Sequence, residues 1–258
     1  MSERVSLQCW HNGEANGMMR DGMIVDHSMQ QEFLSMAKPT INILVVFYSF
    51  AGHTAQLAKH IAKGSASVDS VRVDVKQVPE LLPDSFFAKN EALQEARREF
   101  ANIPIATISD LIKADGVAFG TPVHFGSFAS QLKQFIDQLS PVFTKGTLLN
   151  KPAALFTSSG STHGGEEVAL LSLMVPLLNL GMLPIGVPYP VQGAGPEFDA
   201  GSPYGAIFVS GHKGEKKLSD GDAKVAQLLG RRLAAVTKVM KRGIDACPDC
   251  AFLAQQYD

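Results

Sequence analysis

The six apolar residues at positions 43–48, ILVVFY, are followed almost at once by a segment with helical periodicity. A continuous apolar run of this kind is typical of a strand that is buried on both faces, as in parallel sheets covered by helices. Between Thr54 and Lys63 the apolar side chains recur on one side of a helix, and Gly64 is the expected end of that helix. This combination predicts an α/β fold in which the first strand passes directly into a helix.

Strand and helix signals alternate along the rest of the chain. Residues 71–75 alternate apolar and charged side chains, which predicts an outer strand with one face in water. The helix expected at 168–178 is apolar all round, which predicts burial, either within the chain or between subunits. Further strands are expected at 116–120, 153–156, 183–187 and 206–209, and helices at 91–100, 132–139 and 223–241. Because parallel neighbours need crossover connections, we predict a three-layer α/β sandwich with a central five-stranded parallel sheet.

Composition excludes several classes of protein. The 258 residues include 23 basic and 25 acidic residues, so the net charge is -2 and no basic surface for nucleic acid is expected. No apolar stretch reaches the roughly 18 residues that would span a membrane. Only three cysteines occur, which fits a reducing compartment. We therefore expect a cytoplasmic protein with no nucleic-acid partner and no membrane span.

The two ends of the chain differ from its centre. Residues 1–37 are polar and aperiodic, and we expect them to form a disordered extension. Residues 38–243 carry the strand and helix signals and should form one domain, and residues 244–258 should form a flexible tail. In this tail, Cys247 and Cys250 form a C-x-x-C motif, which is weak evidence for zinc without a second pair or a nearby histidine. A redox-active pair is the alternative, and we expect no metal site.

The loop after the first strand combines hydroxyl groups with the start of a helix. It contains Ser49, Gly52 and Thr54, and it lacks the G-x-x-x-x-G-K-[ST] pattern of nucleoside triphosphatases. The start of a helix supplies unpaired amides and a partial positive charge, and a glycine lets an anion approach the backbone. The loop therefore predicts a phosphate site, although a simple Ser/Thr helix cap followed by a turn is an equal alternative.

Two further loops with a ligand-binding composition follow the third and fourth strands. Residues 120–127, GTPVHFGS, would suit a flat aromatic ligand, although a Thr-Pro turn can be only a turn and His124 can be an ordinary surface histidine. Residues 156–165, FTSSGSTHGG, are too polar and glycine-rich to be core. Since ligands of parallel sheets bind at the carboxyl ends of the strands, these loops should meet at one edge. Together they are much more specific than any one of them.

The order and spacing of these motifs resemble the flavodoxin-like NAD(P)H:quinone oxidoreductases of the WrbA type. The shared landmarks extend from Ile41 to Lys241 and include GTP at 120–122, FIDQ at 135–138 and SPYGA at 202–206. The resemblance implies a flavodoxin-like fold with strand order 2-1-3-4-5, FMN as the cofactor and a homotetramer. It also implies two-electron reduction of a quinone, with NADH or NADPH as the electron donor.

Carried over by position, the resemblance assigns the FMN contacts to the three loops. They are Ser49, Phe50, Ala51, Gly52, His53 and Thr54 in the first loop, Thr121, Pro122, Val123, His124, Phe125 and Gly126 in the second, and Ser158, Ser159, Gly160, Ser161, Thr162 and Gly164 in the third. The resemblance further implies that His124, Phe125 and Asn179 position the flavin ring, and that Ala51 and Phe143 face the substrates.

Some of these positions depart from the family pattern. Ala51 replaces a tyrosine on the nicotinamide side, Val123 and His124 replace a threonine and an arginine, Asn179 replaces a histidine, and Phe143 replaces a tryptophan. Because these replacements remove hydrogen-bonding groups or ring area, we expect looser FMN binding than is usual for the family.

The reaction we predict on this basis is ping-pong: NAD(P)H reduces FMN and leaves, and a quinone then takes up the hydride. The cofactor supplies the chemistry, so no side-chain nucleophile and no metal is expected. The alternatives are a flavodoxin-like electron carrier and a binding or scaffold protein that holds little FMN. The additional segments at 79–104 and 188–203 argue against a small carrier.

Overall fold

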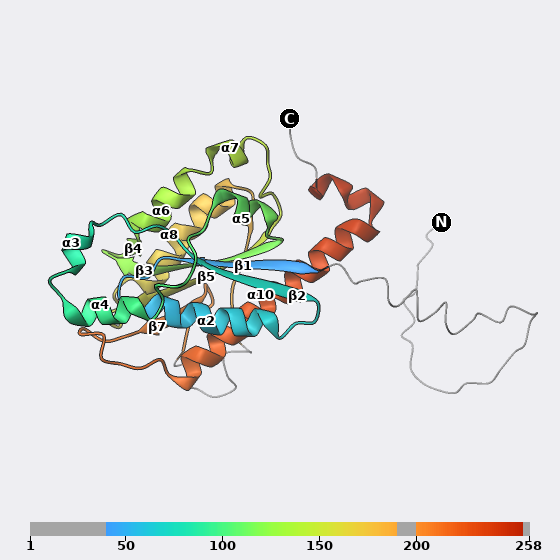
Figure 1. Ribbon diagram of the computed structural model, residues 1–258. Coiled ribbons are helices and arrows are strands. Elements are labelled where there is room, and N and C mark those ends of the chain that lie inside the picture. The colour runs from blue at the N-terminus through green and yellow to red at the C-terminus, as the bar shows by residue number, and fades with distance from the viewer. Residues whose placement is uncertain (1–39, 190–199, 255–258) are drawn as a thin grey trace, which may run out of the picture. The chain divides into compact units, whose positions relative to one another are not determined.

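The computed structural model describes residues 40–189 and 200–254. The extension expected at 1–37 and the central part of the segment at 188–203 lie outside these residues. Within the described ranges, the chain forms one sheet with helices on both faces (Figure 1). None of the described helices is long and apolar enough to cross a membrane.

Five parallel strands form the continuous path of the sheet in the described part of the chain. Their spatial order is β2-β1-β3-β5-β6, which is 2-1-3-4-5 when the parallel strands are counted along the chain. The short strand β4 (Ser127–Phe128) is antiparallel to β3. The five strands are β1 (Ile41–Phe47), β2 (Val71–Gln77), β3 (Gly116–His124), β5 (Pro152–Ser159) and β6 (Leu183–Ile185). The predicted flavodoxin-like topology is confirmed.

The fifth position of the sheet is shared by two short strands. β6 pairs with residues 152–154 at the start of β5, whereas β7 (Ala206–Val209) pairs with residues 156–159 at its end. The chain therefore leaves the sheet after Ile185 and returns to it at Ala206. This return brings Ser210, which directly follows β7, to the edge where β5 also ends.

The alternation of side chains along β1 divides the core into two halves. Ile43, Val45 and Phe47 pack in one apolar cluster, and Leu44 and Val46 pack in the other. Helices of the first cluster are α2 (His53–Ala66) and α10 (Asp220–Ala246), and those of the second include α5 (Ile108–Lys113), α6 (Ser130–Asp137) and α8 (Glu166–Asn179). Figure 1 shows α2 and α10 below the sheet and α5, α6 and α8 above it. The predicted three layers are confirmed.

The segment between β2 and α5 contains two short helices. They are α3 (Asp84–Phe87) and α4 (Glu91–Arg98), and the side chain of Asn90 caps α4 by accepting from the Leu93 amide at 3.0 Å. A third short helix, α7 (Ser140–Phe143), follows α6. The predicted helix at 91–100 thus exists, although the sequence pattern did not indicate α3.

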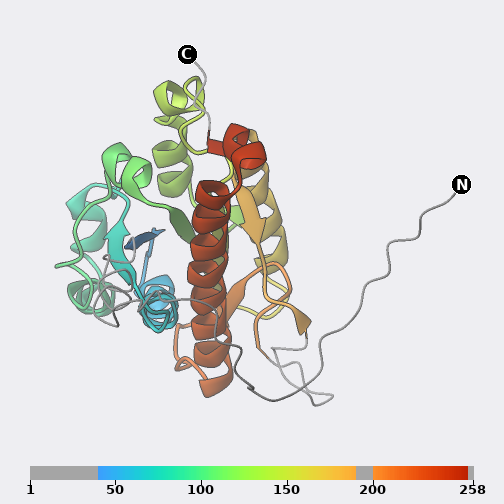
Figure 2. The same cartoon turned by 90° about the vertical axis from the view of Figure 1, so that its right-hand side faces the viewer.

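α2 does not end at Gly64, as the sequence predicted, but continues to Ala66. A Cβ atom at Gly64 would collide with the backbone of Gln227 in α10, and one at Gly230 would collide with the backbone of Ile61 in α2. The two glycines therefore let α2 pack closely against α10. Figure 2 shows α10 along its whole length in front of the sheet. The sequence could not reveal this crossing, because its partners are far apart in the chain.

The end of the described chain is helical. α10 runs to Ala246, beyond the end predicted at 241, and a 3-10 helix follows at Pro248–Ala254. Cys247 and Cys250 are joined by a disulfide. The side-chain amide of Asn150 donates to the Leu253 carbonyl oxygen at 2.9 Å. Residues 244–254, which we expected to be a flexible tail, therefore contact the domain.

Candidate functional site

The loops that follow β1, β3 and β5 meet at one edge of the sheet. Together with the residue after β7 they line a cavity of about 110 Å³. The lining residues are Ser49, Phe50, Ala51, His53 and Thr54 from the first loop, Pro122, Val123 and His124 from the second, Ser158, Ser159 and Gly160 from the third, and Ser210 after β7. The parallel topology thus brings together residues that the sequence assigned to one site.

The first loop ends in a helix start that no side chain caps. Gly52 precedes α2 with a φ of 88°, a conformation that L side chains rarely adopt. The amides of His53 and Thr54 have no acceptor among the residues that the structure describes. These two donors lie at the positive end of a helix of 14 residues. Amides in this position are available to an anionic ligand.

Buried hydroxyl groups surround this helix start. The Oγ1 atom of Thr54 lies 2.7 Å from the Oγ atom of Ser158, which links the first loop to the third. The Oγ atom of Ser49 accepts from the Ala55 amide at 3.3 Å. The loop itself contains no lysine, arginine or carboxylate. The donor set of amides and neutral hydroxyls therefore fits a phosphate group, and the alternative of a simple Ser/Thr cap does not describe this loop, since Gly52 occupies the cap position.

Phe125 in the second loop has an unusual conformation and exposure. It is fully exposed and has a φ of 51°, and Gly126 follows with a φ of 75°. The two residues form a tight turn between β3 and β4, in which His124 pairs with Ser127. A left-handed conformation costs about 1–2 kcal/mol for a residue other than glycine. Contact with a ligand would explain why a large apolar side chain is held in this position.

Thr121 holds the second loop in place. Its Oγ1 atom accepts from the Ala129 amide at 2.8 Å and donates to the Pro122 carbonyl oxygen at 2.9 Å. The Oγ1 atom of Thr157 donates to the Thr121 carbonyl oxygen at 2.7 Å. Both threonines are completely buried. The hydroxyl of Thr121 therefore fixes the loop, and a ligand would meet the loop through its backbone and through Val123.

His124 lies between two aromatic side chains. The centroid of its ring is 6.2 Å from that of Tyr48 and 6.1 Å from that of Phe50, with the rings nearly perpendicular in both cases. Burial lowers the pKa of His124 from its ordinary value, and the charge of Glu80 opposes this shift only in part. The imidazole is therefore neutral at pH 7, with one nitrogen that donates and one that accepts.

The third loop is held by a buried carboxylate. The Oγ atom of Ser159 donates to Glu166 at 2.7 Å and lies 3.1 Å from the Ser161 carbonyl oxygen, and the Oγ atom of Ser210 donates to the Ser159 carbonyl oxygen at 3.0 Å. The Gly164 amide closes a turn by donating to the Ser161 carbonyl oxygen at 3.2 Å. All four residues Gly160, Ser161, Thr162 and Gly164 are exposed, but only Gly160 lines the cavity.

The second and third loops also touch each other. Gly165 has a φ of 102°, and a Cβ atom built on it would lie only 2.8 Å from the Cα atom of Gly126. Gly165 therefore requires glycine both for its conformation and for the close approach to Gly126, whereas Gly126, with a φ of 75°, favours glycine for its conformation alone. The contact fixes the separation of the second and third loops.

Comparison with known proteins assigns the chain to a family. The family model described as NADPH-dependent FMN reductase matches residues 41–195. The chain belongs to this family. Among its relatives, the NAD(P)H dehydrogenase (quinone) of Syntrophobacter fumaroxidans is 39% identical over 204 residues, which are 78% of this chain and 100% of the relative. The protein of the same name from Geobacter sulfurreducens is 38% identical over 198 residues, covering 76% of this chain and 97% of the relative.

Solved structures of flavodoxins share the fold. A WrbA-like flavodoxin from Agrobacterium tumefaciens matches with a TM-score of 0.54 and 22% identity, and covers 77% of this chain and 98% of its own. A flavodoxin from the domain Archaea matches with a TM-score of 0.51 and 18% identity, and covers 77% of this chain and 99% of its own. The predicted resemblance to WrbA-type proteins is confirmed by these relatives and neighbours.

Two residues that the family pattern assigns to the site lie away from it in this chain. Asn179 is exposed at the end of α8, where its side-chain amide donates to the Val175 carbonyl oxygen at 3.2 Å. Because α8 runs back from the end of β5 towards the start of β6, this end of the helix lies at the opposite edge of the sheet. Phe143 ends α7, which follows a helix that also runs back, and it is 55% exposed. Neither residue lines the cavity.

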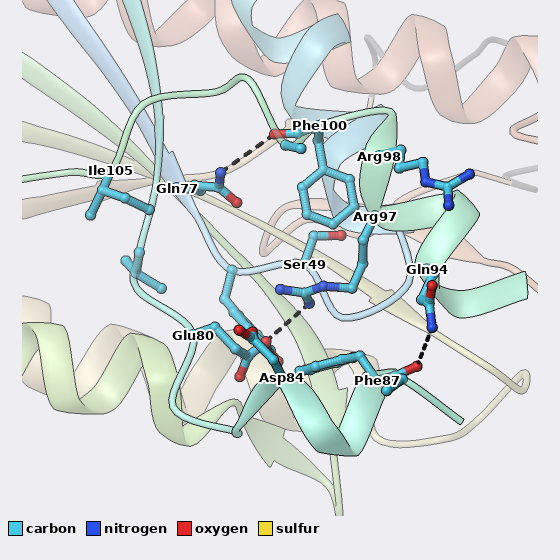
Figure 3. A pocket seen from close by; sticks show the side chains of 14 residues that line it. Ser49, Gln77, Glu80, Asp84, Phe87, Gln94, Arg97, Arg98, Phe100 and Ile105 are labelled. Carbon is cyan, nitrogen blue, oxygen red and sulfur yellow. Dashed lines mark hydrogen bonds and ion pairs between the residues drawn. The ribbon is translucent and has the colours of Figure 1, made fainter. Parts of the chain in front are cut away.

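A buried polar network beside the first loop was not predicted as part of the site. One Oε atom of Glu80 accepts from the Tyr48 hydroxyl at 2.9 Å and from Arg97 at 3.0 Å (Figure 3). The other accepts from the Gln131 side-chain amide at 3.0 Å. Burial raises the pKa of the Glu80 carboxyl, but hydrogen bonds, first from the Leu82 amide and then from Gln131 and Tyr48, outweigh it and lower the pKa overall. Burial and the charge of Glu80 raise the pKa of Tyr48.

This network supports the first loop of the family site. Arg97 reaches it from α4, and its Nη1 atom also lies 3.5 Å from the carbonyl oxygen of Phe50. Arg97 and Gln131 carry no local signal of a role in the sequence. Only their meeting at Glu80 in the folded chain reveals it.

Proposed function

We propose that this chain is an FMN-dependent NAD(P)H:quinone oxidoreductase. The observation that carries the proposal is the combination of three loops at one sheet edge with relatives named NAD(P)H dehydrogenase (quinone), which this chain matches along their full or nearly full length. The family description, NADPH-dependent FMN reductase, supports the same cofactor and the same class of electron donor.

The residues present fit FMN. Its phosphate would accept from the amides of His53 and Thr54 and from the hydroxyls around them, in a loop without a competing carboxylate. Its ring would meet the turn at Phe125 and the backbone of the second and third loops. When bound, FMN supplies the acceptance and donation of hydride.

The side chains of the chain then act by positioning and by hydrogen bonding. The neutral ring of His124 offers a single N–H to an acceptor without bringing a positive charge into the site. Thr121 and Thr157 hold the second loop, so that its backbone groups stay in place. We infer that NAD(P)H and the quinone use the same opening in turn, which is ping-pong kinetics.

Two measurements test this proposal and separate its rivals. The absorption spectrum of the purified protein, with and without added FMN, shows whether the cofactor binds. Steady-state oxidation of NADH or NADPH with benzoquinone shows whether the bound cofactor turns over, and parallel double-reciprocal lines are expected. Bound FMN without turnover would indicate an electron carrier, and failure to bind FMN would indicate a scaffold protein.

We further propose that the protein forms a homo-oligomer, as a tetramer. α8 presents an apolar stripe to the outside, with side chains that recur at helical spacing and are 42–59% exposed: Val168, Leu171, Val175 and Leu178. Contiguous exposed apolar surface of this kind usually marks an interface. Since Asn179 and Phe143 lie far from the cavity of their own chain, they would reach a cofactor only on a neighbouring subunit.

A further inference from the structure

A second and larger cavity lies on the other side of Ser49 from the candidate cofactor site. Its volume is about 550 Å³, and Ser49 lines both cavities. It is an open cavity bordered by α3, α4 and the ends of β1 and β2, and Figure 3 shows its lining side chains. We refer to it as the α3–α4 cavity. Neither the family resemblance nor the loops described above assign it a ligand.

Arg97 presents unused donors to the α3–α4 cavity. Its guanidinium carbon lies 4.1 Å from the centroid of the Phe87 ring and 5.8 Å from that of Phe100. Its hydrogen bonds to Glu80 and to the Phe50 carbonyl oxygen both use Nη1. The Nε and Nη2 atoms therefore retain donors, on a group whose flat face is fixed against aromatic rings.

Acceptors and apolar surface complete the lining. Gln77 and Gln94 each use the side-chain nitrogen to bond to backbone carbonyl oxygens, which leaves both amide oxygens to accept. Phe100 and Ile105 supply apolar walls, and Ile105 is 49% exposed. A ligand that suits this lining is flat and apolar on its faces, and carries both donors and acceptors on its edge.

The charges around the cavity are almost all compensated. Arg97 is paired with Glu80, and Arg98 is paired with Glu95. The remaining charged side chain of the lining is Asp84, at the first turn of α3, and its carboxylate has no hydrogen-bond or ion-pair partner among the residues that the structure describes. The cavity is therefore unsuited to a ligand with a net negative group next to Asp84.

We propose that the α3–α4 cavity binds the adenosine half of the electron donor and that Asp84 makes NADH the preferred donor. This inference rests on the proposed function. Adenine has flat faces for the phenyl rings, an amino group for the glutamine oxygens, and ring nitrogens that accept from Arg97. A carboxylate that binds the ribose 2'-hydroxyl is the usual determinant of NADH binding, and it repels the additional phosphate of NADPH.

The α3–α4 cavity lies close enough to the second loop for a single dinucleotide to contact both of them. The ring of Phe50 lies 5.9 Å from that of Phe87, which lines the cavity, and 6.1 Å from that of His124, which lines the candidate cofactor site. A single phenyl ring thus separates the proposed adenosine position from the loop assigned to the flavin. A donor molecule would pass over Phe50 with its adenosine in one cavity and its nicotinamide at the other.

Binding of donor fragments tests the inference without relying on turnover. Adenosine 5'-monophosphate and adenosine 2',5'-bisphosphate are titrated calorimetrically into the FMN-saturated protein. We expect the monophosphate to bind and the bisphosphate to bind roughly five- to tenfold more weakly, because it brings a phosphate next to Asp84. In the Asp84→Asn variant this difference should disappear, whereas the control Glu91→Gln, which removes an exposed carboxylate in the first turn of α4, should leave it unchanged.

A second variant tests the location. Ala101→Trp places a large side chain in the α3–α4 cavity, and it should abolish binding of the monophosphate and raise KM for NADH with FMN affinity unchanged. If Ala101→Trp binds the monophosphate like the unmodified protein, or if the bisphosphate binds more tightly, the inference is overturned. Binding of the monophosphate without quinone reduction would reject the proposed function alone. Quinone reduction without such binding would reject the inference alone.

Discussion

Replacing Thr54 by aspartate should separate cofactor affinity from stability. Thr54 is buried in the first turn of α2, and its hydroxyl lies 2.7 Å from that of Ser158. A carboxylate at this position would take the place proposed for the phosphate, where it can accept from the same amides and from Ser158. Because a negative charge in the first turn of a helix is stabilising by about 0.3–1 kcal/mol, the free energy of unfolding should change little.

The effect on FMN should be large. Two unit charges about 4 Å apart interact by roughly 4 kcal/mol at an effective dielectric constant of about 20, and each 1.4 kcal/mol corresponds to a factor of about ten. We therefore expect the Kd for FMN to rise by about three powers of ten, measured by quenching of flavin fluorescence. Thermal unfolding of the protein without FMN should show a Tm close to that of the unmodified chain.

Thr54→Val is the matched control, because it removes the hydroxyl without adding a charge. Loss of one hydrogen bond typically costs about 0.5–1.5 kcal/mol, so FMN should bind about two- to tenfold more weakly. If Thr54→Asp binds FMN as tightly as Thr54→Val, the phosphate does not bind at the start of α2. A collapse of stability in Thr54→Asp alone would show that the donors around Thr54 cannot accept an anion.

Further predictions follow from the site and the surfaces. Val123→Thr should strengthen FMN binding by up to about tenfold by restoring a hydrogen-bonding group, and an unchanged Kd in a fluorescence titration would show that this position does not touch the cofactor. Since burial lowers the pKa of His124, the unfolded chain takes up its proton first, so the free energy of unfolding should fall as the pH drops below about 6.5. Denaturant titrations at several pH values should show a smaller fall in His124→Gln. Val175→Glu places a charge in the apolar stripe of α8 and should reduce the mass found by light scattering; an unchanged mass would place the interface elsewhere. Deletion of residues 1–35 should leave Tm, FMN affinity and oligomer size intact, because this segment is polar and has no helix or strand periodicity, and a large loss of Tm would refute this.

The sheet was predictable because its signals are local. The apolar run that became β1 and the alternation that became β2 each reflect burial of one or both faces, and the need for crossover connections then predicted a parallel sheet covered by helices. The order of the strands came from the family resemblance. The extra strand β7 was also visible as a short apolar segment. Its role was not, because the pairing of β6 and β7 with different parts of β5 depends on a long-range register that no local pattern carries.

The position of the candidate site was predictable from the topology, but its long-range contacts were not. Three polar loops at the ends of strands one, three and four had to converge, since the topology determines where they lie. Arg97 was missed because the segment around it is charged and irregular, and its contacts with Glu80 and Phe87 exist only in the folded chain. Asn179 and Phe143 were assigned by family position, which does not distinguish residues of one subunit from residues of its neighbour.

The close crossing of α2 and α10 has a consequence for when the site can form. His53 and Thr54, whose amides would hold the phosphate, stand at the start of α2, and Gly64 lies about 16 Å further along the same rigid helix, at a rise of about 1.5 Å per residue. The contact of Gly64 with Gln227 therefore orients the phosphate-binding end of α2. Since α10 follows all three loops in the chain, a growing polypeptide orients this end of α2 only after α10 has been synthesised and has docked. We expect FMN uptake to follow the docking of α10.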